Sequence, residues 1–234
     1  MGKLVCIAIF SLAVGAGVFS WSGPGEQTTA DTGDIDARVR RFLESSGRSW
    51  YGMSVPDADG QALHDIVLQH KYKSALEIGT SVGRSAVWIG WALSKTGGKL
   101  VTIEIDPDAH KEALANFRET GLLKYIDARL GDAHKIVPEL SGPFDFVFCD
   151  ADKDWYSNYL DAVLPKLTVG GCFAAHNVSE GYSRGYGGRG RGGYGRGGGS
   201  GFFEYARSIP SLETTIVNVR GSAGMSVSYK KAAK

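Results

Sequence analysis

The sequence predicts an α/β fold in which a mostly parallel sheet has helices on both faces and an antiparallel C-terminal hairpin. Between residues 74 and 175, short apolar runs alternate with longer helical stretches. The short runs are apolar on both faces, which is typical of parallel strands covered by helices. Two final runs, residues 212–219 and 225–229, lie close together around Gly221 and Gly224, and this spacing favours the hairpin.

The elements follow one another in βαβ order. Ahead of the first strand, residues 35–43 and 60–70 have the spacing of amphipathic helices. The expected strands are residues 74–78, 100–104, 128–130, 144–149 and 172–175, and the helical stretches between them are residues 85–94, 108–119, 133–140 and 156–167. Right-handed crossovers between such strands give a Rossmann-like, doubly wound sheet.

Composition indicates one globular domain, which we place at residues 34–234. The chain has 234 residues, 26 of them basic and 25 acidic, and 43% are hydrophobic, which excludes disordered, collagen-like and coiled-coil classes. Four of the basic residues are arginines of one glycine tract, so the rest is mildly acidic and bulk charge does not favour nucleic acid. Cys149 and Cys172 lie in strand-like runs and are predicted to be buried thiols, and Trp88 is expected in the core.

The N-terminal segment, residues 1–25, is similar to a secretory signal peptide. Lys3 precedes an apolar run at residues 4–19, with small-residue cleavage positions after Ala16 or Ser20. An uncleaved membrane anchor is the alternative, and a helix packed on a soluble domain is another. The segment therefore predicts export or membrane attachment, with a cytoplasm-facing anchored form also open. Residues 26–33 form a polar linker.

Residues 181–201 contain twelve glycines, four arginines, three tyrosines and no acid. Glycine loses the most backbone entropy on ordering, so we predict a flexible loop that serves as a lid or spacer. RNA binding is the alternative, because arginine and tyrosine can neutralise phosphates and stack on bases.

A glycine turn follows the first strand and opens the next helix. Gly79 and Gly83 flank Ser81, which stands where a dinucleotide-binding turn has its middle glycine. A side chain there hinders close approach of a pyrophosphate, so a cofactor without phosphate fits better. Glu104 ends the second strand, where an acid can accept both hydroxyls of a ribose.

Polar side chains also follow the fourth and fifth strands. Asp150 and Lys153 come after one, and His176 and Asn177 come at the end of the other. Because the carboxyl ends of adjacent parallel strands meet at one edge of a sheet, these groups are expected to form a composite site.

From residue 53 to residue 177 these motifs resemble the class I S-adenosylmethionine-dependent O-methyltransferases of the metal-dependent catechol and caffeoyl-CoA type. The resemblance implies that S-adenosylmethionine is the cofactor, with Ser85 at its methionine carboxylate, and that the acceptor is a small aromatic hydroxyl compound. It makes His134 a candidate contact of the adenine ring and favours a homodimer. The implied cofactor-binding residues are Met53, Val55, Glu77, Gly79, Ser81, Gly83, Ser85, Glu104, Asp132, Ala133 and Asp150.

The resemblance also implies a catalytic base, Lys153, and a divalent metal held by Asp150 and a consecutive Asp-Asn pair. Here His176 replaces the aspartate and Asn177 is retained. Imidazole is a softer ligand than carboxylate, so Mn²⁺ or another softer ion becomes an alternative to Mg²⁺. A histidine beside a weak metal site and a site without metal are the other outcomes.

Two further hypotheses compete with the methyltransferase. In one, a methyltransferase-like domain with weakened chemistry binds RNA or a protein partner through the glycine tract. In the other, the chain methylates RNA that the tract delivers.

Overall fold

The computed structural model describes residues 30–46, 54–178, 198–217 and 221–233. Its centre is a seven-stranded sheet in the order β3-β2-β1-β4-β5-β7-β6. Neighbouring strands from β3 to β5 are parallel, whereas β7 is antiparallel to both β5 and β6. The strands are β1 (Ser74–Ile78), β2 (Lys99–Glu104), β3 (Ile126–Leu130), β4 (Phe144–Cys149), β5 (Leu167–His176), β6 (Leu212–Val217) and β7 (Met225–Lys230).

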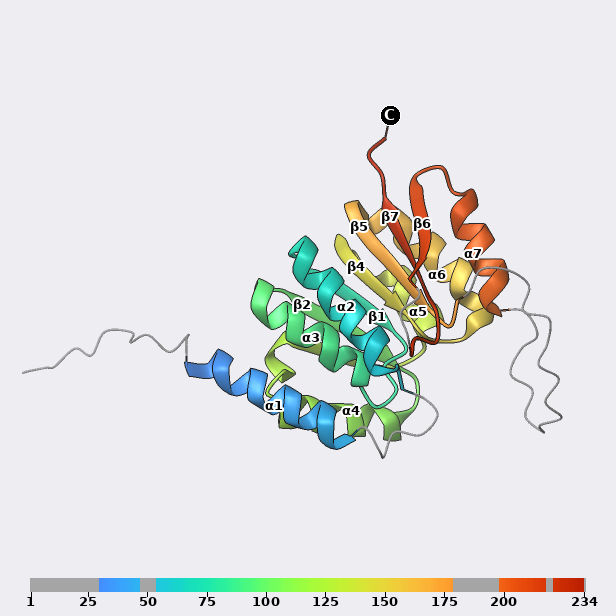
Figure 1. The fold of residues 1–234 in the computed structure, drawn as a ribbon. Coiled ribbons are helices and arrows are strands. Elements are labelled where there is room, and N and C mark those ends of the chain that lie inside the picture. The colour runs from blue at the N-terminus through green and yellow to red at the C-terminus, as the bar shows by residue number, and fades with distance from the viewer. Residues whose placement is uncertain (1–29, 47–53, 179–197, 218–220, 234) are drawn as a thin grey trace, which may run out of the picture.

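Helices cover both faces of this sheet (Figure 1). The helices α1 (Ala30–Ser46), α2 (Asp57–His70), α3 (Arg84–Thr96) and α4 (Pro107–Thr120) lie on one side, and α5 (Ala133–Glu139), α6 (Tyr156–Val163) and α7 (Gly198–Ser208) lie on the other. Three single turns of 3₁₀ helix complete the described part: η1 (Leu123–Tyr125), η2 (Lys153–Trp155) and η3 (Leu164–Lys166). The doubly wound, mostly parallel fold predicted from the sequence is confirmed.

The central strands are buried on both faces, as their apolar runs predict. In β4, Phe146 and Phe148 pack with α2 and α3, while Val147 and Cys149 pack with α6. Successive side chains of a strand point to opposite faces, so each central strand contributes to both halves of the core. Cys149 and Cys172 are free and buried, as predicted.

Several elements have bounds other than those predicted; three of the differences are at α1, at the boundary between α6 and β5, and at α7. α1 begins at Ala30, inside the expected linker. α6 ends at Val163 and gives way to η3, which contains Pro165, so β5 begins four residues later at Leu167. Proline lacks the N–H that would continue an α-helix.

The third difference is the helix α7, which the glycine-rich composition of residues 198–201 does not predict. Its first residues, 198–201, belong to the tract that was predicted to be a loop throughout. Phe202, Phe203 and Ala206 of this helix are buried against the α6 side of the sheet. These three apolar residues have helical spacing, and their burial stabilises a helix that a glycine-rich segment alone would not form.

Several predictions concern residues outside the described ranges. They are the leader or anchor at residues 1–25, the cofactor contact of Met53, and the loop or RNA-binding role of residues 181–197. None of the helices in the described ranges combines the length and apolar character needed to traverse a bilayer.

Candidate cofactor and catalytic site

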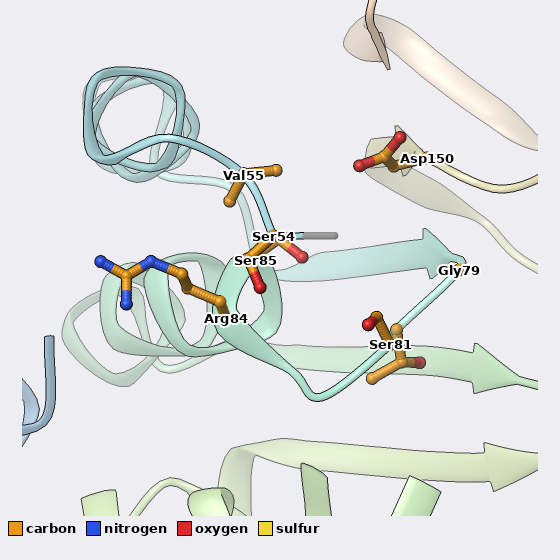
Figure 2. A pocket seen from close by; sticks show the side chains of 8 residues that line it. Ser54, Val55, Gly79, Ser81, Arg84, Ser85 and Asp150 are labelled. Atoms are coloured by element: carbon orange, nitrogen blue, oxygen red, sulfur yellow. The ribbon is translucent and has the colours of Figure 1, made fainter. Parts of the chain in front are cut away.

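A small pocket opens at the carboxyl edge of the sheet, between the glycine turn and the chain that leads into α2. Figure 2 shows its lining residues at the start of α3, in the turn, on the chain before α2 and at the end of β4, with the guanidinium of Arg84 directed away from Ser81 and Asp150. Five of the expected cofactor residues line it, and the full lining is Ser54, Val55, Gly79, Thr80, Ser81, Arg84, Ser85 and Asp150. The structure thus brings together segments that lie far apart in the sequence.

Gly79 lets the glycine turn lie directly against the chain leaving β4. Its φ is +92°, and a Cβ at this position would lie 2.6 Å from the carbonyl oxygen of Asp150. The amide of Asp150 in turn donates to the carbonyl of Ile78 at 2.9 Å. A side chain at residue 79 would push the end of β1 away from the end of β4. Glycine at this position therefore allows Asp150 to lie beside the pocket.

Glu104 lies at the glycine turn, as expected. The amide of Ser81 donates to its Oε2 at 2.6 Å, and the amides of Ile105 and Asp106 donate to Oε1 at 2.9 and 2.8 Å. Three backbone donors fix the carboxylate in one orientation. A carboxylate has about four lone-pair sites, so capacity to accept further hydroxyl groups remains.

Glu77 is a fully buried carboxyl group in β1, with 0% of its surface exposed. The hydroxyl of Thr102 donates to Oε2 at 2.5 Å, whereas Oε1 is buried without a hydrogen-bond partner. Burial raises the pKa of Glu77 to about 8. A buried oxygen without a partner next to the glycine turn is a position where a donor of a bound ligand would be stabilised.

The residues expected at the adenine lie at the start of α5. Asp132 caps this helix by accepting from the amide of His134 at 3.0 Å. The His134 ring stacks on Trp155 with centroids 3.7 Å apart, and its Nε2 lies 3.0 Å from an oxygen of Asp152. Asp132, Ala133 and His134 do not line the pocket described above, and their contact with the cofactor stays a prediction.

Asp150 and Lys153 form the part of the site with acid–base potential. Nζ of Lys153 donates to Oδ1 of Asp150 at 2.6 Å and to the hydroxyl of Tyr156 at 2.5 Å. The Tyr156 hydroxyl donates in turn to the backbone carbonyl of His176 at 3.3 Å. These contacts hold the amine of Lys153 at the edge of the pocket that Asp150 lines.

His176 lies between two carboxylates. Its Nδ1 is 3.0 Å from Oδ2 of Asp150, and its Nε2 is 3.0 Å from Oδ2 of Asp59. Asp59 is completely buried and also accepts from the Ser222 hydroxyl and from the amide of Ala223, the latter at 2.9 Å. Because ionised carboxylates only accept hydrogen bonds, the doubly protonated imidazolium satisfies both partners.

The charges of this network stabilise one another. Burial alone would lower the pKa of His176, but the hydrogen bonds and charges of Asp150 and Asp59 outweigh it and the pKa is raised. Burial alone would raise the pKa of Asp150, but His176 and Lys153 outweigh it and the pKa is lowered. Two carboxylates therefore face two cationic side chains in one cluster, in which Asp59 and His176 are buried and Asp150 and Lys153 are partly exposed.

Sequence analysis did not single out Asp59 and Ser222. Asp59 directly precedes the helix expected at residues 60–70, where an acid is ordinarily a solvated group at a helix N-terminus. Its contacts with His176 and Ser222 span 117 and 163 residues of chain. Local spacing carries no signal for pairs this distant.

In this arrangement the expected metal ligands Asp150 and His176 are bonded to each other and to other side chains, and metal binding by them stays a prediction. Both ring nitrogens of His176 lie against carboxylate oxygens, and both oxygens of Asp150 are bonded to cationic groups. Asn177 is exposed, with a φ of +56°. Within the described ranges, no group of three or more His, Cys, Asp or Glu side chains is placed to hold a metal ion.

The sheet order, the glycine turn and the carboxylate at the end of β2 define a Rossmann-like domain of the methyltransferase class. The sequence model of the O-methyltransferase family matches residues 26–181, more than half of the chain. The chain belongs to the O-methyltransferase family.

Curated relatives are similar to it over part of their length. A catechol O-methyltransferase of Niastella koreensis is 36% identical over 130 residues, which cover 54% of this chain and 58% of the relative. Caffeoyl-CoA O-methyltransferase 1 of Eucalyptus globulus is 32% identical over 133 residues, which cover 55% of this chain and 54% of the relative. The chain thus spans little more than half the length of these relatives.

Solved structures agree with the fold over most of the chain. A putative O-methyltransferase from Klebsiella pneumoniae superposes with a TM-score of 0.69 at 25% identity, covering 89% of this chain and 92% of the other. An O-methyltransferase from Bacillus cereus, solved in complex with SAH, has a TM-score of 0.68 at 24% identity and covers 84% of this chain and 91% of the other.

Proposed function

We propose that this chain is an S-adenosylmethionine-dependent O-methyltransferase that acts on a small aromatic acceptor with adjacent hydroxyl groups. The observation that carries the proposal is the contact between Gly79 and Asp150, which places the glycine-turn pocket beside Lys153. Cofactor pocket and candidate base then share one edge of the sheet.

The residues that line the pocket and the two glutamates beside the glycine turn fit S-adenosylmethionine. Glu104 offers a fixed acceptor for ribose hydroxyls, and the unpartnered oxygen of Glu77 offers an acceptor for an amine. Arg84, the one cationic side chain of the lining, is buried and paired with Asp57, so the pocket favours a cofactor without phosphate. We assign cofactor binding to the residues expected from the sequence: Met53, Val55, Glu77, Gly79, Ser81, Gly83, Ser85, Glu104, Asp132, Ala133 and Asp150.

Lys153 is proposed as the catalytic base. When bound, the cofactor supplies a methyl group on a sulfonium; the oxygen–carbon bond forms with a lone pair of the acceptor, and the carbon–sulfur pair stays on sulfur. Lys153 is paired with Asp150 in the site described above, so it first releases a proton; its free amine then takes the proton of the acceptor hydroxyl at Nζ. Asp150 and Tyr156 hold Nζ in place, which is what in-line transfer over about 3 Å requires.

The acceptor class follows from the relatives. Two of them are named for catechol and for caffeoyl-CoA, which are both phenolic compounds. Because the chain matches only part of each, the acceptor is proposed at the level of this class. Nothing in the described site favours RNA methylation or an RNA-binding role over it.

The test has a binding arm and a turnover arm. Isothermal titration of the purified chain should show binding of S-adenosylmethionine and of its demethylated product, and Glu104→Gln should weaken both. Radiolabelled cofactor should transfer methyl to catechol or to a hydroxycinnamoyl acceptor. Lys153→Met should lower kcat roughly 10²- to 10⁴-fold while cofactor binding is retained.

Lys111→Met on the exposed surface of α4 is the matched control and should leave kcat unchanged. Cofactor binding without methylation of any such acceptor would contradict the enzyme proposal and favour a methyltransferase-like binding domain.

A further inference from the structure

We propose that His176, held between Asp59 and Asp150, takes the place of the divalent cation, so that methyl transfer at this site needs no metal and His176 acts as a positioning residue for Asp150 and Lys153. This inference rests on the proposed function and adds to it the way in which the base is held.

Both nitrogens of the His176 imidazole already lie next to a carboxylate oxygen. Nδ1 and Nε2 leave an imidazole in different directions, and each lies 3.0 Å from a carboxylate oxygen. Whichever nitrogen carries a proton, each has a hydrogen-bond partner, so neither lone pair is directed at a vacant coordination position. Metal-bound histidines use one nitrogen for the metal and only the other for a hydrogen bond.

A cation also has little access to Asp150, because its neighbours are buried or positively charged. His176 is 4% exposed and Asp59 is fully buried, so the cation would have to reach Asp150 from the pocket side. There Oδ1 is bonded to Lys153. A dication on Asp150 would compete with His176 and Lys153 for the same two oxygens and would weaken the contact that joins Asp150 to the buried Asp59–His176 pair. Removing one partner from a buried ionic network is strongly destabilising.

The fold fixes Asp59 as a permanent partner of His176. The Ser222 hydroxyl and the amide of Ala223 both donate to Asp59, and they belong to the turn that leads into β7. β7 pairs with β5 so that Met225 is opposite His176. The pairing of β5 with β7 therefore positions both the imidazole of His176 and the two donors that hold Asp59.

Two routes connect His176 to the base. Its side chain orients Asp150, which accepts from Lys153, and its carbonyl accepts from Tyr156, which also accepts from Lys153. The contacts close a ring through four residues. A chelated metal would orient the hydroxyl group of the methyl acceptor. The ring of four residues instead orients the amine of Lys153, which receives the proton of that hydroxyl.

The first experiment tests metal binding and metal dependence on the full chain. After treatment with EDTA, calorimetric titration of Mg²⁺ and of Mn²⁺ into the chain saturated with S-adenosylhomocysteine should show no saturable binding. With an active acceptor, kcat should be the same in EDTA, Mg²⁺ and Mn²⁺. Saturable binding of either ion, or activity lost in EDTA and restored by that ion, would overturn the proposal.

Variants test the role of the imidazole. His176→Gln keeps one hydrogen-bonding group but cannot bridge both carboxylates as an imidazole does, so kcat should fall roughly 10- to 100-fold with KM for S-adenosylmethionine unchanged. His64→Gln is the matched control, a largely buried histidine of α2 outside the ring, and should leave both constants unchanged. Unchanged kcat in folded His176→Gln would overturn the positioning role.

The double variant Asp59→Asn/His176→Asp supplies a carboxylate at residue 176 and removes the competing one. It should acquire saturable Mn²⁺ or Mg²⁺ binding that the parent chain lacks. Absence of binding in the folded double variant would contradict the idea that the imidazole is what excludes the ion. If no acceptor is methylated under any condition the proposed function fails, whereas the calorimetric comparison still decides the metal question.

Discussion

At the scale of single residues, the least usual group is the Glu77 carboxyl. It is fully buried, accepts one hydrogen bond from Thr102 and has a second oxygen without a partner. Because burial raises its pKa to about 8, this group is neutral in the folded chain at pH values where it is ionised in the unfolded chain.

Glu77 therefore makes stability fall as pH rises. Between the unfolded pKa, about 4.5, and the folded pKa of about 8, the folded chain binds one more proton than the unfolded chain. We expect Glu77→Gln to remove this dependence, so that the free energy of unfolding declines less from pH 5 to pH 8 than in the parent, by a few kcal/mol at about 1.4 kcal/mol per pKa unit. Urea unfolding at several pH values measures it. Parallel curves for the two proteins would contradict the raised pKa.

Residue-scale prediction succeeded where a motif is local. The turn from Gly79 to Ser85 and the carboxylate of Glu104 were expected at one strand edge, and the structure places them there. It failed for Asp59, whose partners lie far along the chain. The sequence pattern shows that an acid is present at residue 59. Only the folded structure shows that its partner is His176.

At the scale of elements, the α2–α3 contact depends on the absence of a side chain at Gly60. A Cβ there would lie 2.2 Å from Cδ1 and from Nε1 of Trp88, which is 7% exposed and packs in the core as expected. Asp59 is the neighbouring residue, so this close contact also sets where the acid of the His176 network lies.

We expect Gly60→Ala to lower the free energy of unfolding by about 1–3 kcal/mol, because the ring of Trp88 would have to move within a packed core. Chemical denaturation with Trp fluorescence measures the change. Gly201→Ala is the control: in α7 a Cβ meets nothing within 4 Å, and alanine has the higher helix propensity, so stability should rise by up to about 1 kcal/mol. Equal effects of the two substitutions would refute the packing explanation.

Element boundaries were predictable where apolar periodicity is strong. β1 and β4 have the bounds expected from their runs of apolar residues. α7 was missed because four of its eleven residues belong to a low-complexity tract, and composition masked the apolar face that begins at Phe202. Burial against α6 and the sheet determines that helix, and burial is a tertiary property.

At the scale of the whole molecule, the turn before β7 connects the C-terminal hairpin to α2. The Ser222 hydroxyl and the Ala223 amide both bind Asp59, although 163 and 164 residues separate them from it. The edge hairpin and the helix layer are thereby joined at the edge of the sheet where Asp150 and His176 lie.

Ser222→Ala should leave a buried carboxylate with one donor fewer, which costs about 1–3 kcal/mol and corresponds to a fall in Tm of several degrees for a chain of this size. Differential scanning calorimetry measures it. Ser211→Ala, at an exposed position next to β6, should leave Tm unchanged. An unaltered Tm in Ser222→Ala would mean that the turn does not hold Asp59.

This long connection also affects how the chain matures during synthesis. A ribosome makes Asp59 163 residues before it makes Ser222. Until residues 222–230 have left the exit tunnel, Asp59 on α2 lacks two of its donors and His176 lacks its neighbouring strand β7. A nascent chain can therefore form the glycine-turn pocket before the β6–β7 hairpin supplies the donors that hold Asp59 against His176.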